Sequence, residues 1–320
     1  MSNEKHTVKV MRITEVAQGV REIVLKSANP GLLPAFTPGA HVDVFLPNAM
    51  ARAYSLTNAS EPQGATEYVL AIGLASASRG GSRYVHEQLQ EGELLEVGTP
   101  RNLFPLSDDP APALLIAGGI GITPLRAMAR LRQAQKRPWH LVYAARSRAH
   151  AAYASELMAH GDAVEFHFDS EMGGPLAVGQ ALAGLTPQTH LYCCGPQALM
   201  DKVRELAAGH PSSHLHFESF GAQLPASTGP QARGFAVELA RQGRVIEVAP
   251  DRSLIDCLED SGVVVPSVCR EGICGACECT VLGGEVDHRD SILSDAEKQA
   301  NQTMMICVSR AKGERLVLDL

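Results

Sequence analysis

Short runs of alternating apolar and polar residues dominate the first third of the chain. They read HTVKVMRI, REIVLKS, AHVDVFL and EYVLAIGLA, and turn residues separate them. Alternation with a period of two puts apolar side chains on one face of a strand. Residues 4 to about 107 are therefore predicted to form an antiparallel barrel or sandwich, in which only SRYVHEQL has a helical pattern.

A different pattern begins near residue 111, where apolar runs alternate with segments of helical period. The predicted strands are ALLIA, WHLVYAA, AVEFHF and HLYCCG, and between or after them come PLRAMARLRQAQK, YASELMAH, LAVGQALAG and PQALMDKVRELAA. Such an order predicts a doubly wound parallel sheet. The segment GAQLPASTGPQARG then resembles a linker, and the remaining residues open with the hairpin-like FAVELARQGRVIEVAP.

Composition limits the class of protein. The 320 residues are 45% hydrophobic and 20% charged, which fits two or three globular domains. We expect a cytoplasmic protein, since no apolar run reaches the ~18 residues of a membrane span and the N-terminus lacks a signal-peptide pattern. In that compartment, clustered cysteines indicate metal or redox chemistry rather than disulfides.

The charge argues against nucleic acid as a general partner, because the formal net charge is -7. The acid is concentrated at one end, where residues 233–320 hold 15 Asp and Glu but 10 Lys and Arg. This excess is either a solubilising surface or an acidic docking face for a more basic protein.

Four cysteines stand in the spacing C-x4-C-x2-C followed by a distant fourth. The predicted metal ligands are Cys269, Cys274, Cys277 and Cys307. This is the plant-type [2Fe-2S] spacing, whereas structural zinc sites normally pair two C-x2-C knuckles. Gly272 and Gly275 permit the sharp turns that such a loop needs. Cys279 falls in the outgoing strand ECTVLGG and is predicted to be a non-ligand.

The segment LLIAGGIGITPL follows a buried strand and opens a helix. Gly118, Gly119 and Gly121 allow a tight turn and close approach by a pyrophosphate, and Thr123 is predicted to be the N-cap with Pro124 in the first turn. A Gly-rich turn alone can be a simple connection. It gains weight here because it begins the alternating α/β region.

Two further segments could bind an anionic cofactor. RAYSL sends Arg52 and Tyr54 to one strand face and Ser55 to the other, and SRGGSRYVHEQ is a Gly turn leading into a helix. Read alone, Arg52 is a surface charge and Tyr54 is packing.

Taken together, RAYSL, GGIGITP, YCCGP and CREGICGAC resemble, in this order, the phthalate dioxygenase reductase type within the ferredoxin–NADP reductase superfamily. The resemblance covers essentially the whole chain. It implies an antiparallel flavin-binding β-barrel (1–108), a doubly wound NAD-binding α/β domain (109–222), a linker (223–234) and an α+β, β-grasp ferredoxin domain with a plant-type [2Fe-2S] cluster (235–320).

The resemblance also implies roles for matching positions. The flavin would be held by Arg52, Ala53, Tyr54, Ser55, Gly80, Gly81 and Ser82. The dinucleotide would meet Gly119, Ile120, Gly121, Thr123, Cys194, Gly195 and Pro196, with Arg146, Ser147 and Asp169 near the adenine ribose. The reacting centre would be surrounded by Ser55, Cys194, Glu218 and Phe220. Asp169 favours NADH over NADPH, although Arg146 and Arg148 leave that choice open.

The implied activity passes electrons from NADH to FMN, then to the [2Fe-2S] cluster, and then to a Rieske-type non-haem iron oxygenase, with the reductase expected to be a monomer. The resemblance implies FMN rather than FAD, because family members with this domain order use FMN. FAD would need a further adenosine site, for which no aromatic platform is evident. Two alternatives are a reductase of the same design with another acceptor, such as a cytochrome P450 or a hydroxylamine-reducing protein, and a non-catalytic redox sensor.

The ligand assignment can be tested with two cysteine variants. Cys307→Ser should lose the iron–sulfur absorbance but retain reduction of the flavin by NADH, because only the cluster needs that thiolate. Cys279→Ser should retain both. Loss of the cluster in Cys279→Ser would show that the fourth ligand is wrongly assigned.

Overall fold

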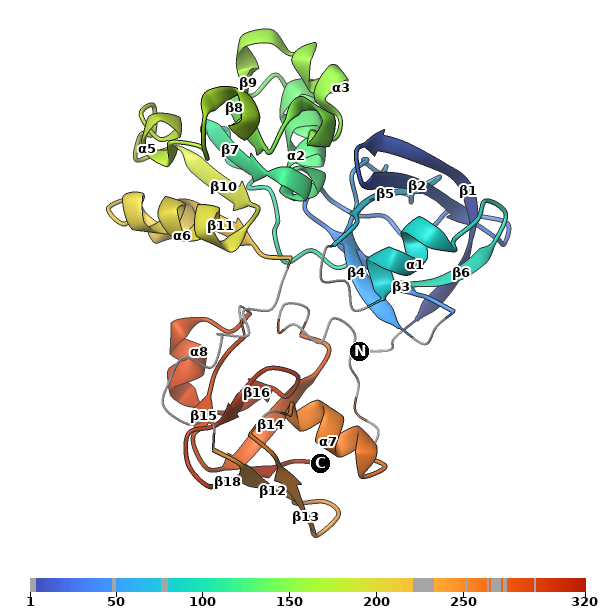
Figure 1. Ribbon diagram of the computed structural model, residues 1–320, viewed down its shortest axis with the longest axis vertical. Coiled ribbons are helices and arrows are strands. Elements are labelled where there is room, and N and C mark those ends of the chain that lie inside the picture. Colours follow the sequence, from blue (N-terminus) through green and yellow to red (C-terminus); the bar gives the residue numbers. More distant parts are fainter. Residues whose placement is uncertain are drawn as a thin grey trace. The chain divides into compact units, whose positions relative to one another are not determined.

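The computed structural model describes residues 4–47, 50–75, 80–220, 233–250, 252–263, 265, 272, 275–290 and 292–320. The chain divides into two compact units, Met1–Glu218 and Ser219–Leu320 (Figure 1). The predicted linker falls largely outside the described residues.

The first unit begins with a six-stranded antiparallel sheet in the order β4-β3-β6-β1-β2-β5. Its strands are β1 (Lys5–Ala17), β2 (Val20–Ser27), β3 (His41–Phe45), β4 (Ala51–Ser55), β5 (Tyr68–Gly73) and β6 (Leu94–Gly98). The sheet closes into a barrel at its two edges, where Leu56 bridges Leu70 and the Thr57 amide donates to the Val69 carbonyl at 2.9 Å. The helix α1 (Gly81–Glu87) lies over β5, and the predicted antiparallel barrel is confirmed.

The same unit continues with a five-stranded parallel sheet in the order β11-β10-β7-β8-β9. Its strands are β7 (Ala113–Gly118), β8 (Trp139–Ala145), β9 (Val164–Phe168), β10 (His190–Cys194) and β11 (Leu215–Glu218). The intervening helices are η1 (Gly119–Gly121), α2 (Ile122–Ala134), η2 (Arg148–His150), α3 (Ala154–Met158), η3 (Gly161–Ala163), α4 (Asp169–Met172), α5 (Val178–Ala181), α6 (Gln197–Leu206) and η4 (Ser212–His214).

This sheet is covered on both faces, as the alternating pattern predicts. Leu115 and Tyr143 pack with Leu125 of α2 on one face, whereas Ile116 packs with Val203 of α6 on the other (Figure 1). Successive residues of a strand point to opposite faces, so the near-continuous apolar runs are what a sheet buried on both sides requires.

Arg126, a buried residue of α2, connects the α/β domain to the barrel. Its guanidinium donates to the carboxylate of Glu156 at 2.7 and 3.1 Å and to both the carbonyl and the hydroxyl oxygen of Thr57 at 3.2 Å. It also lies 3.8 Å from the ring centroid of Tyr153. A buried guanidinium is stable only where its donors find partners, so these contacts fix α2 against the segment that directly follows β4.

The second unit is a five-stranded mixed sheet in the order β13-β12-β18-β14-β16, with a separate two-stranded sheet, β15-β17. The elements are β12 (Phe235–Leu239), β13 (Arg244–Val248), α7 (Leu254–Asp260), β14 (Glu278–Gly283), β15 (Val286–Asp287), α8 (Asp295–Ala300), β16 (Thr303–Met305), β17 (Arg310–Ala311) and β18 (Arg315–Leu318). The predicted hairpin is β12 with β13, and β12 runs parallel to β18. Leu258 of α7 is fully buried with Val237 and Leu316, which gives the α+β, β-grasp arrangement.

Among the described residues, no helix is both long and apolar enough to cross a membrane.

Replacing Arg126 should destabilise the first unit. Arg126→Ala leaves the Thr57 carbonyl without its donor, and we expect a loss of about 1.5–3 kcal/mol, the usual contribution of hydrogen bonds to charged groups. Trp139, the single tryptophan, lies on β8, so its fluorescence during urea unfolding reports on this unit.

The matched control is Lys202→Ala, which removes an exposed ion pair with Glu205 on α6. Such pairs contribute about 0.5 kcal/mol or less. Equal shifts of the unfolding midpoint in the two variants would contradict the role given to Arg126.

Candidate functional site

The carboxyl ends of β7 and β10 lie side by side, where the strand order of the parallel sheet reverses. A side chain at Gly121 would overlap the carbonyl oxygen of Cys194, and a Cβ at Gly118 would lie 2.6 Å from the Pro196 ring. A Cβ at Gly195 would lie 2.8 Å from the Cα of Gly118. The glycines therefore let two backbone turns meet at the switch point, where open α/β sheets bind ligands.

The start of α2 differs in detail from the prediction. The N-cap position is Gly121, not Thr123, so the predicted capping role of Thr123 is wrong. Thr123 is buried, and its hydroxyl donates to the Ile120 carbonyl at 3.0 Å instead of accepting an amide hydrogen bond. The first amides of α2 consequently have no side-chain cap, and a helix N-terminus of this kind favours anions.

Glu218 and Cys194 are register partners at the ends of β11 and β10. Burial raises the pKa of the Glu218 carboxyl to about 8. Burial, and then the neighbouring Glu218, raises the pKa of the Cys194 thiol well above its usual value. Both groups are thus mostly protonated at neutral pH.

The Oε2 atom of Glu218 is buried and has no hydrogen-bond partner among the described residues. Leaving a buried polar atom unpaired costs about 1–3 kcal/mol. An unpaired, protonated carboxyl fits a site that meets a polar ligand group, such as a nicotinamide, at this end of the sheet.

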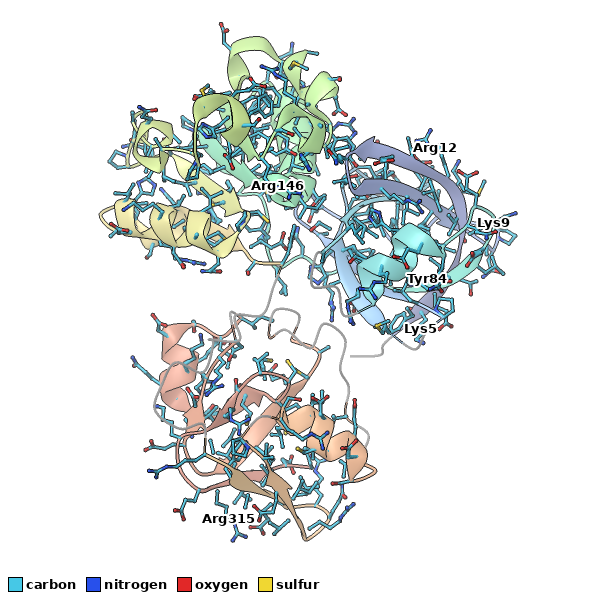
Figure 2. All side chains as sticks on the ribbon, in the orientation of Figure 1. Lys5, Lys9, Arg12, Tyr84, Arg146 and Arg315 are labelled. Atoms are coloured by element: carbon cyan, nitrogen blue, oxygen red, sulfur yellow. The ribbon has the colours of Figure 1, made fainter. Side chains whose placement is uncertain are left out.

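The predicted ribose residues lie at the carboxyl ends of β8 and β9. Arg146 directly follows β8 (Figure 2). It is exposed, and the Ser147 hydroxyl lies 2.8 Å from His150 Nδ1. Asp169, the first residue of α4, has a carboxylate oxygen 3.4 Å from His167 Nε2. The fold therefore brings the ends of β8 and β9 to the same sheet edge as the glycine turn.

The predicted flavin residues come from β4 and from the start of α1. Arg52 packs against Gly81, where a Cβ would lie 2.8 Å from the Arg52 Cγ. Gly80 has a φ of 103°, which suits glycine at this turn. Burial raises the pKa of Tyr54 to about 12. Arg52 and Gly80 are 28 residues apart in the sequence, yet the fold places the Arg52 side chain beside the glycines at the start of α1. A guanidinium next to such a turn fits a phosphate group.

Two of the four predicted cluster ligands lie among the described residues. The Cys277 and Cys307 sulfurs are 3.1 Å apart, and both side chains are buried. Gly272, with a φ of 67°, lies where a Cβ would be 2.5 Å from Val308 Cγ2. Two cysteine sulfurs this close, beside glycines at positive φ, fit thiolate ligation of one cluster. Cys269 and Cys274 lie outside the described residues.

Cys279, the predicted non-ligand, has a different environment. It lies on β14, its sulfur is 3.6 Å from the Thr280 carbonyl oxygen, and burial raises its pKa to about 11. A thiol with so high a pKa is a poor source of thiolate.

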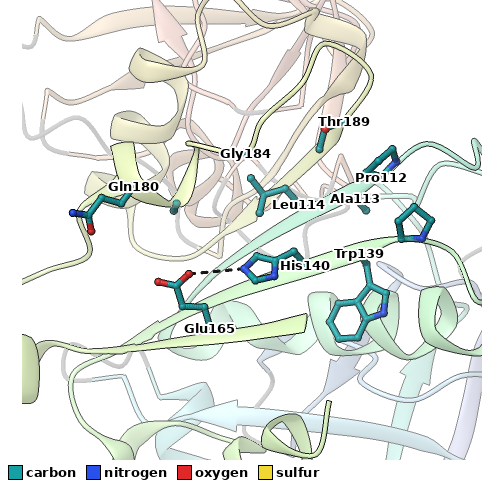
Figure 3. Close-up of a pocket in the computed structure, with 11 residues that line it drawn as sticks. Pro112, Ala113, Leu114, Trp139, His140, Glu165, Gln180, Gly184 and Thr189 are labelled. Carbon is teal, nitrogen blue, oxygen red and sulfur yellow. Dashed lines mark ion pairs between the residues drawn. The ribbon is translucent and has the colours of Figure 1, made fainter. Parts of the chain in front are cut away.

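A cavity of about 390 Å³ lies at the opposite edge of the parallel sheet. It is bordered by Leu114, Trp139 and an ion pair of His140 with Glu165 at 3.9 Å (Figure 3). It holds none of the predicted site residues.

Comparison with known proteins agrees with this arrangement. Residues 115–169 match the family described as oxidoreductase NAD-binding domain, and residues 237–312 match the 2Fe-2S iron-sulfur cluster binding domain. Phenoxybenzoate dioxygenase subunit beta of Ectopseudomonas oleovorans is 41% identical over 315 residues, 97% of each chain. The solved structure of phthalate dioxygenase reductase is 38% identical with a TM-score of 0.77, and the match covers 99% of this chain and 98% of that one.

The chain belongs to the phthalate dioxygenase reductase family.

The family resemblance, the fold class and the activity class of NAD(P)H-dependent flavin and iron–sulfur oxidoreductase are thereby confirmed. Another solved structure, an intact type IV self-sufficient cytochrome P450 monooxygenase, is 37% identical with a TM-score of 0.83. That match covers 99% of this reductase-family chain and 41% of the P450 chain.

The individual site residues remain predictions. The fold brings the residues predicted for the dinucleotide together at one edge of the parallel sheet. It brings the residues predicted for the flavin together beside α1. Sequence reasoning missed Arg126 and Thr57, which join the two domains, and the pairing of Arg148 with Glu171. No local pattern signals such contacts, because each depends on segments that meet only in the folded chain.

Gly121→Ala should impair use of the dinucleotide, because the added methyl group would push the turn after β7 away from Cys194. We expect kcat/KM for NADH with an artificial acceptor to fall at least about tenfold, equivalent to about 1.4 kcal/mol. The control Gly209→Ala adds a methyl group with no atom within 4 Å and should change this value by less than about twofold.

Urea unfolding followed by Trp139 fluorescence separates a local effect from misfolding. An unchanged kcat/KM in folded Gly121→Ala would refute the close-approach argument.

Proposed function

We propose that this chain is the NADH-dependent reductase component of a two-component Rieske-type non-haem iron oxygenase, acting in aromatic-ring dioxygenation or O-demethylation. Electrons pass from NADH to FMN, to the [2Fe-2S] cluster, and to the oxygenase. The observation that carries the proposal is the full-length similarity to a dioxygenase subunit and to a dioxygenase reductase. An oxygenase as electron acceptor fits that similarity.

In this proposal the nicotinamide lies at the ends of β7, β10 and β11. Glu218 supplies a protonated carboxyl that donates to a polar group of the ligand, and Cys194 supplies a neutral thiol that packs beside it. The pKa of about 8 supports a carboxyl that keeps its proton at neutral pH. Gly119, Ile120, Gly121 and Thr123 bring the start of α2 to the pyrophosphate, while Gly195 and Pro196 border the nicotinamide.

At the barrel, Arg52 neutralises the flavin phosphate beside Gly80, Gly81 and Ser82. Ser55, at the end of β4, is assigned to the flavin ring near N5, with Ala53 and Tyr54 along the same strand. Phe220, which lies two residues after Glu218, is assigned to cover the flavin. A bound flavin supplies the conversion of a two-electron hydride into single electrons.

The cluster is assigned to Cys269, Cys274, Cys277 and Cys307. The excess of acidic residues in 233–320 gives this end of the chain a charge that favours a basic oxygenase surface. We further propose a monomer in the cytoplasm, where free cysteines persist.

A cytochrome P450 is the second candidate acceptor. It is favoured by the similarity to a self-sufficient cytochrome P450 monooxygenase, of which the match covers 41%. Turnover with a Rieske oxygenase and with a P450, compared at equal reductase concentration, distinguishes the two.

Anaerobic titration with NADH tests the central proposal. The protein should show overlapping flavin and iron–sulfur absorbance and accept three reducing equivalents, two at the flavin and one at the cluster. Cys307→Ser should accept two.

A colourless protein, or one that contains zinc instead of iron, would refute the electron-transfer function. NADH-dependent reduction of ferricyanide at tens per second would exclude a redox sensor, since enzyme turnover is typically ~1–10³ s⁻¹.

A further inference from the structure

An ion pair stands at the sheet edge where the adenosine end of the dinucleotide is expected. Arg148 begins η2, just after β8, and Glu171 lies in α4, just after β9. The Arg148 Nε and Nη2 atoms donate to the two carboxylate oxygens of Glu171 at 2.7 and 2.9 Å. The pair therefore joins the ends of two adjacent parallel strands.

The geometry of this pair restricts Arg148. Two parallel N–H donors of the guanidinium face the two oxygens, which is the bidentate arrangement in which arginine also binds phosphate. The guanidinium carbon lies 4.6 Å from the ring centroid of Phe168. The hydrogen bonds and charge of Glu171 raise the pKa of Arg148 above its ordinary value. A guanidinium is charged at neutral pH in any case, and in this solvent-exposed pair its two donors face a carboxylate.

The neighbouring groups add negative charge. Asp169 lies two residues before Glu171, and its carboxylate oxygen is 3.4 Å from His167 Nε2. That histidine nitrogen is also 2.8 Å from the Gly174 carbonyl oxygen. Glu171 neutralises the charge of Arg148. The carboxylate of Asp169 is then the charge that remains beside a bound ribose. An added phosphate dianion would meet two carboxylates there.

We infer that Glu171 determines the nucleotide selectivity of this reductase, by engaging Arg148 so that it cannot bind the 2′-phosphate of NADPH. The inference rests on the proposed function, since it concerns the dinucleotide of that same reaction. Asp169 suits a ribose with a free 2′-hydroxyl, whereas Glu171 acts as a positioning residue on Arg148. Selectivity for NADH then depends on a pair of side chains rather than on one acid.

Arg146 is the competing cation at this edge. It is exposed, and no carboxylate pairs with its guanidinium among the described residues. If Arg146 bound the 2′-phosphate, the wild-type protein would accept NADPH even while Glu171 is paired with Arg148. Comparison of the two nucleotides in the wild type therefore decides between the two arginines.

The test is a set of variants assayed with NADH and NADPH, using ferricyanide as acceptor. Glu171→Gln keeps the shape of the side chain but removes its charge and one acceptor oxygen. Glu171→Ala removes the partner completely. We expect the ratio of kcat/KM for NADPH to that for NADH to rise at least tenfold in both variants, because Arg148 becomes available for the phosphate.

Two further variants make the test specific. The double variant Arg148→Ala/Glu171→Gln should lose the gain, since the released cation is then absent. Glu205→Gln is the matched control, because it removes a carboxylate from an exposed ion pair with Lys202 at 2.9 Å, near the end of α6. It should leave the selectivity ratio unchanged.

Inhibition by 2′,5′-ADP gives a second readout that does not depend on electron transfer from NADPH. Its inhibition constant against NADH should fall at least tenfold in Glu171→Gln and Glu171→Ala, but not in Glu205→Gln. Such a change in ligand affinity would not follow from a purely structural loss at α4.

The outcomes separate the two proposals. Wild-type protein that does not oxidise NADH would overturn the proposed function. Wild-type protein that oxidises NADH and NADPH equally well, or folded Glu171 variants whose ratio stays unchanged, would overturn only the inference about Glu171.

Discussion

The contacts of Arg126 hold the nucleotide half of the first unit to the flavin half. This arginine lies on α2, three residues after Thr123, and it donates to Thr57, two residues after Ser55. One side chain therefore joins the helix assigned to the pyrophosphate and the strand assigned to the flavin. A reaction that needs two cofactors a few ångströms apart depends on such a constraint, because a small misplacement lowers the rate steeply.

The close approach of β7 and β10 is a second constraint, and it acts within the α/β domain. Gly118, Gly121 and Gly195 leave no room for side chains between the two turns. The protonated Glu218 and the buried Cys194 then stand at the same edge. A buried polar group without a hydrogen-bond partner destabilises the folded protein, and such groups are found mainly at functional sites. This arrangement provides a binding place for a ligand and lowers the stability of the ligand-free protein.

The separation of the chain into two units also has a chemical meaning. The first unit holds the residues assigned to the dinucleotide and, apart from Phe220, those assigned to the flavin. Two electrons arrive there together. The second holds the neighbouring sulfurs of Cys277 and Cys307, and its residues 233–320 carry an excess of acidic side chains. Chains similar over nearly the whole of this one occur both as a dioxygenase subunit and as part of a self-sufficient cytochrome P450 monooxygenase.

The sequence by itself determined the fold class, the family and the ligand spacing of the cysteines. These follow from local periodicity and from fixed spacings, which a linear pattern records. It did not determine the N-cap of α2, because Gly121 and Thr123 both stand beside the start of the apolar helical pattern, and only the backbone path toward Cys194 selects between them. It could not show that Arg126 reaches Thr57 or that Glu171 occupies Arg148. Each such pair joins residues more than twenty positions apart, and their meeting is decided by the closing of the barrel and by the order of the parallel strands.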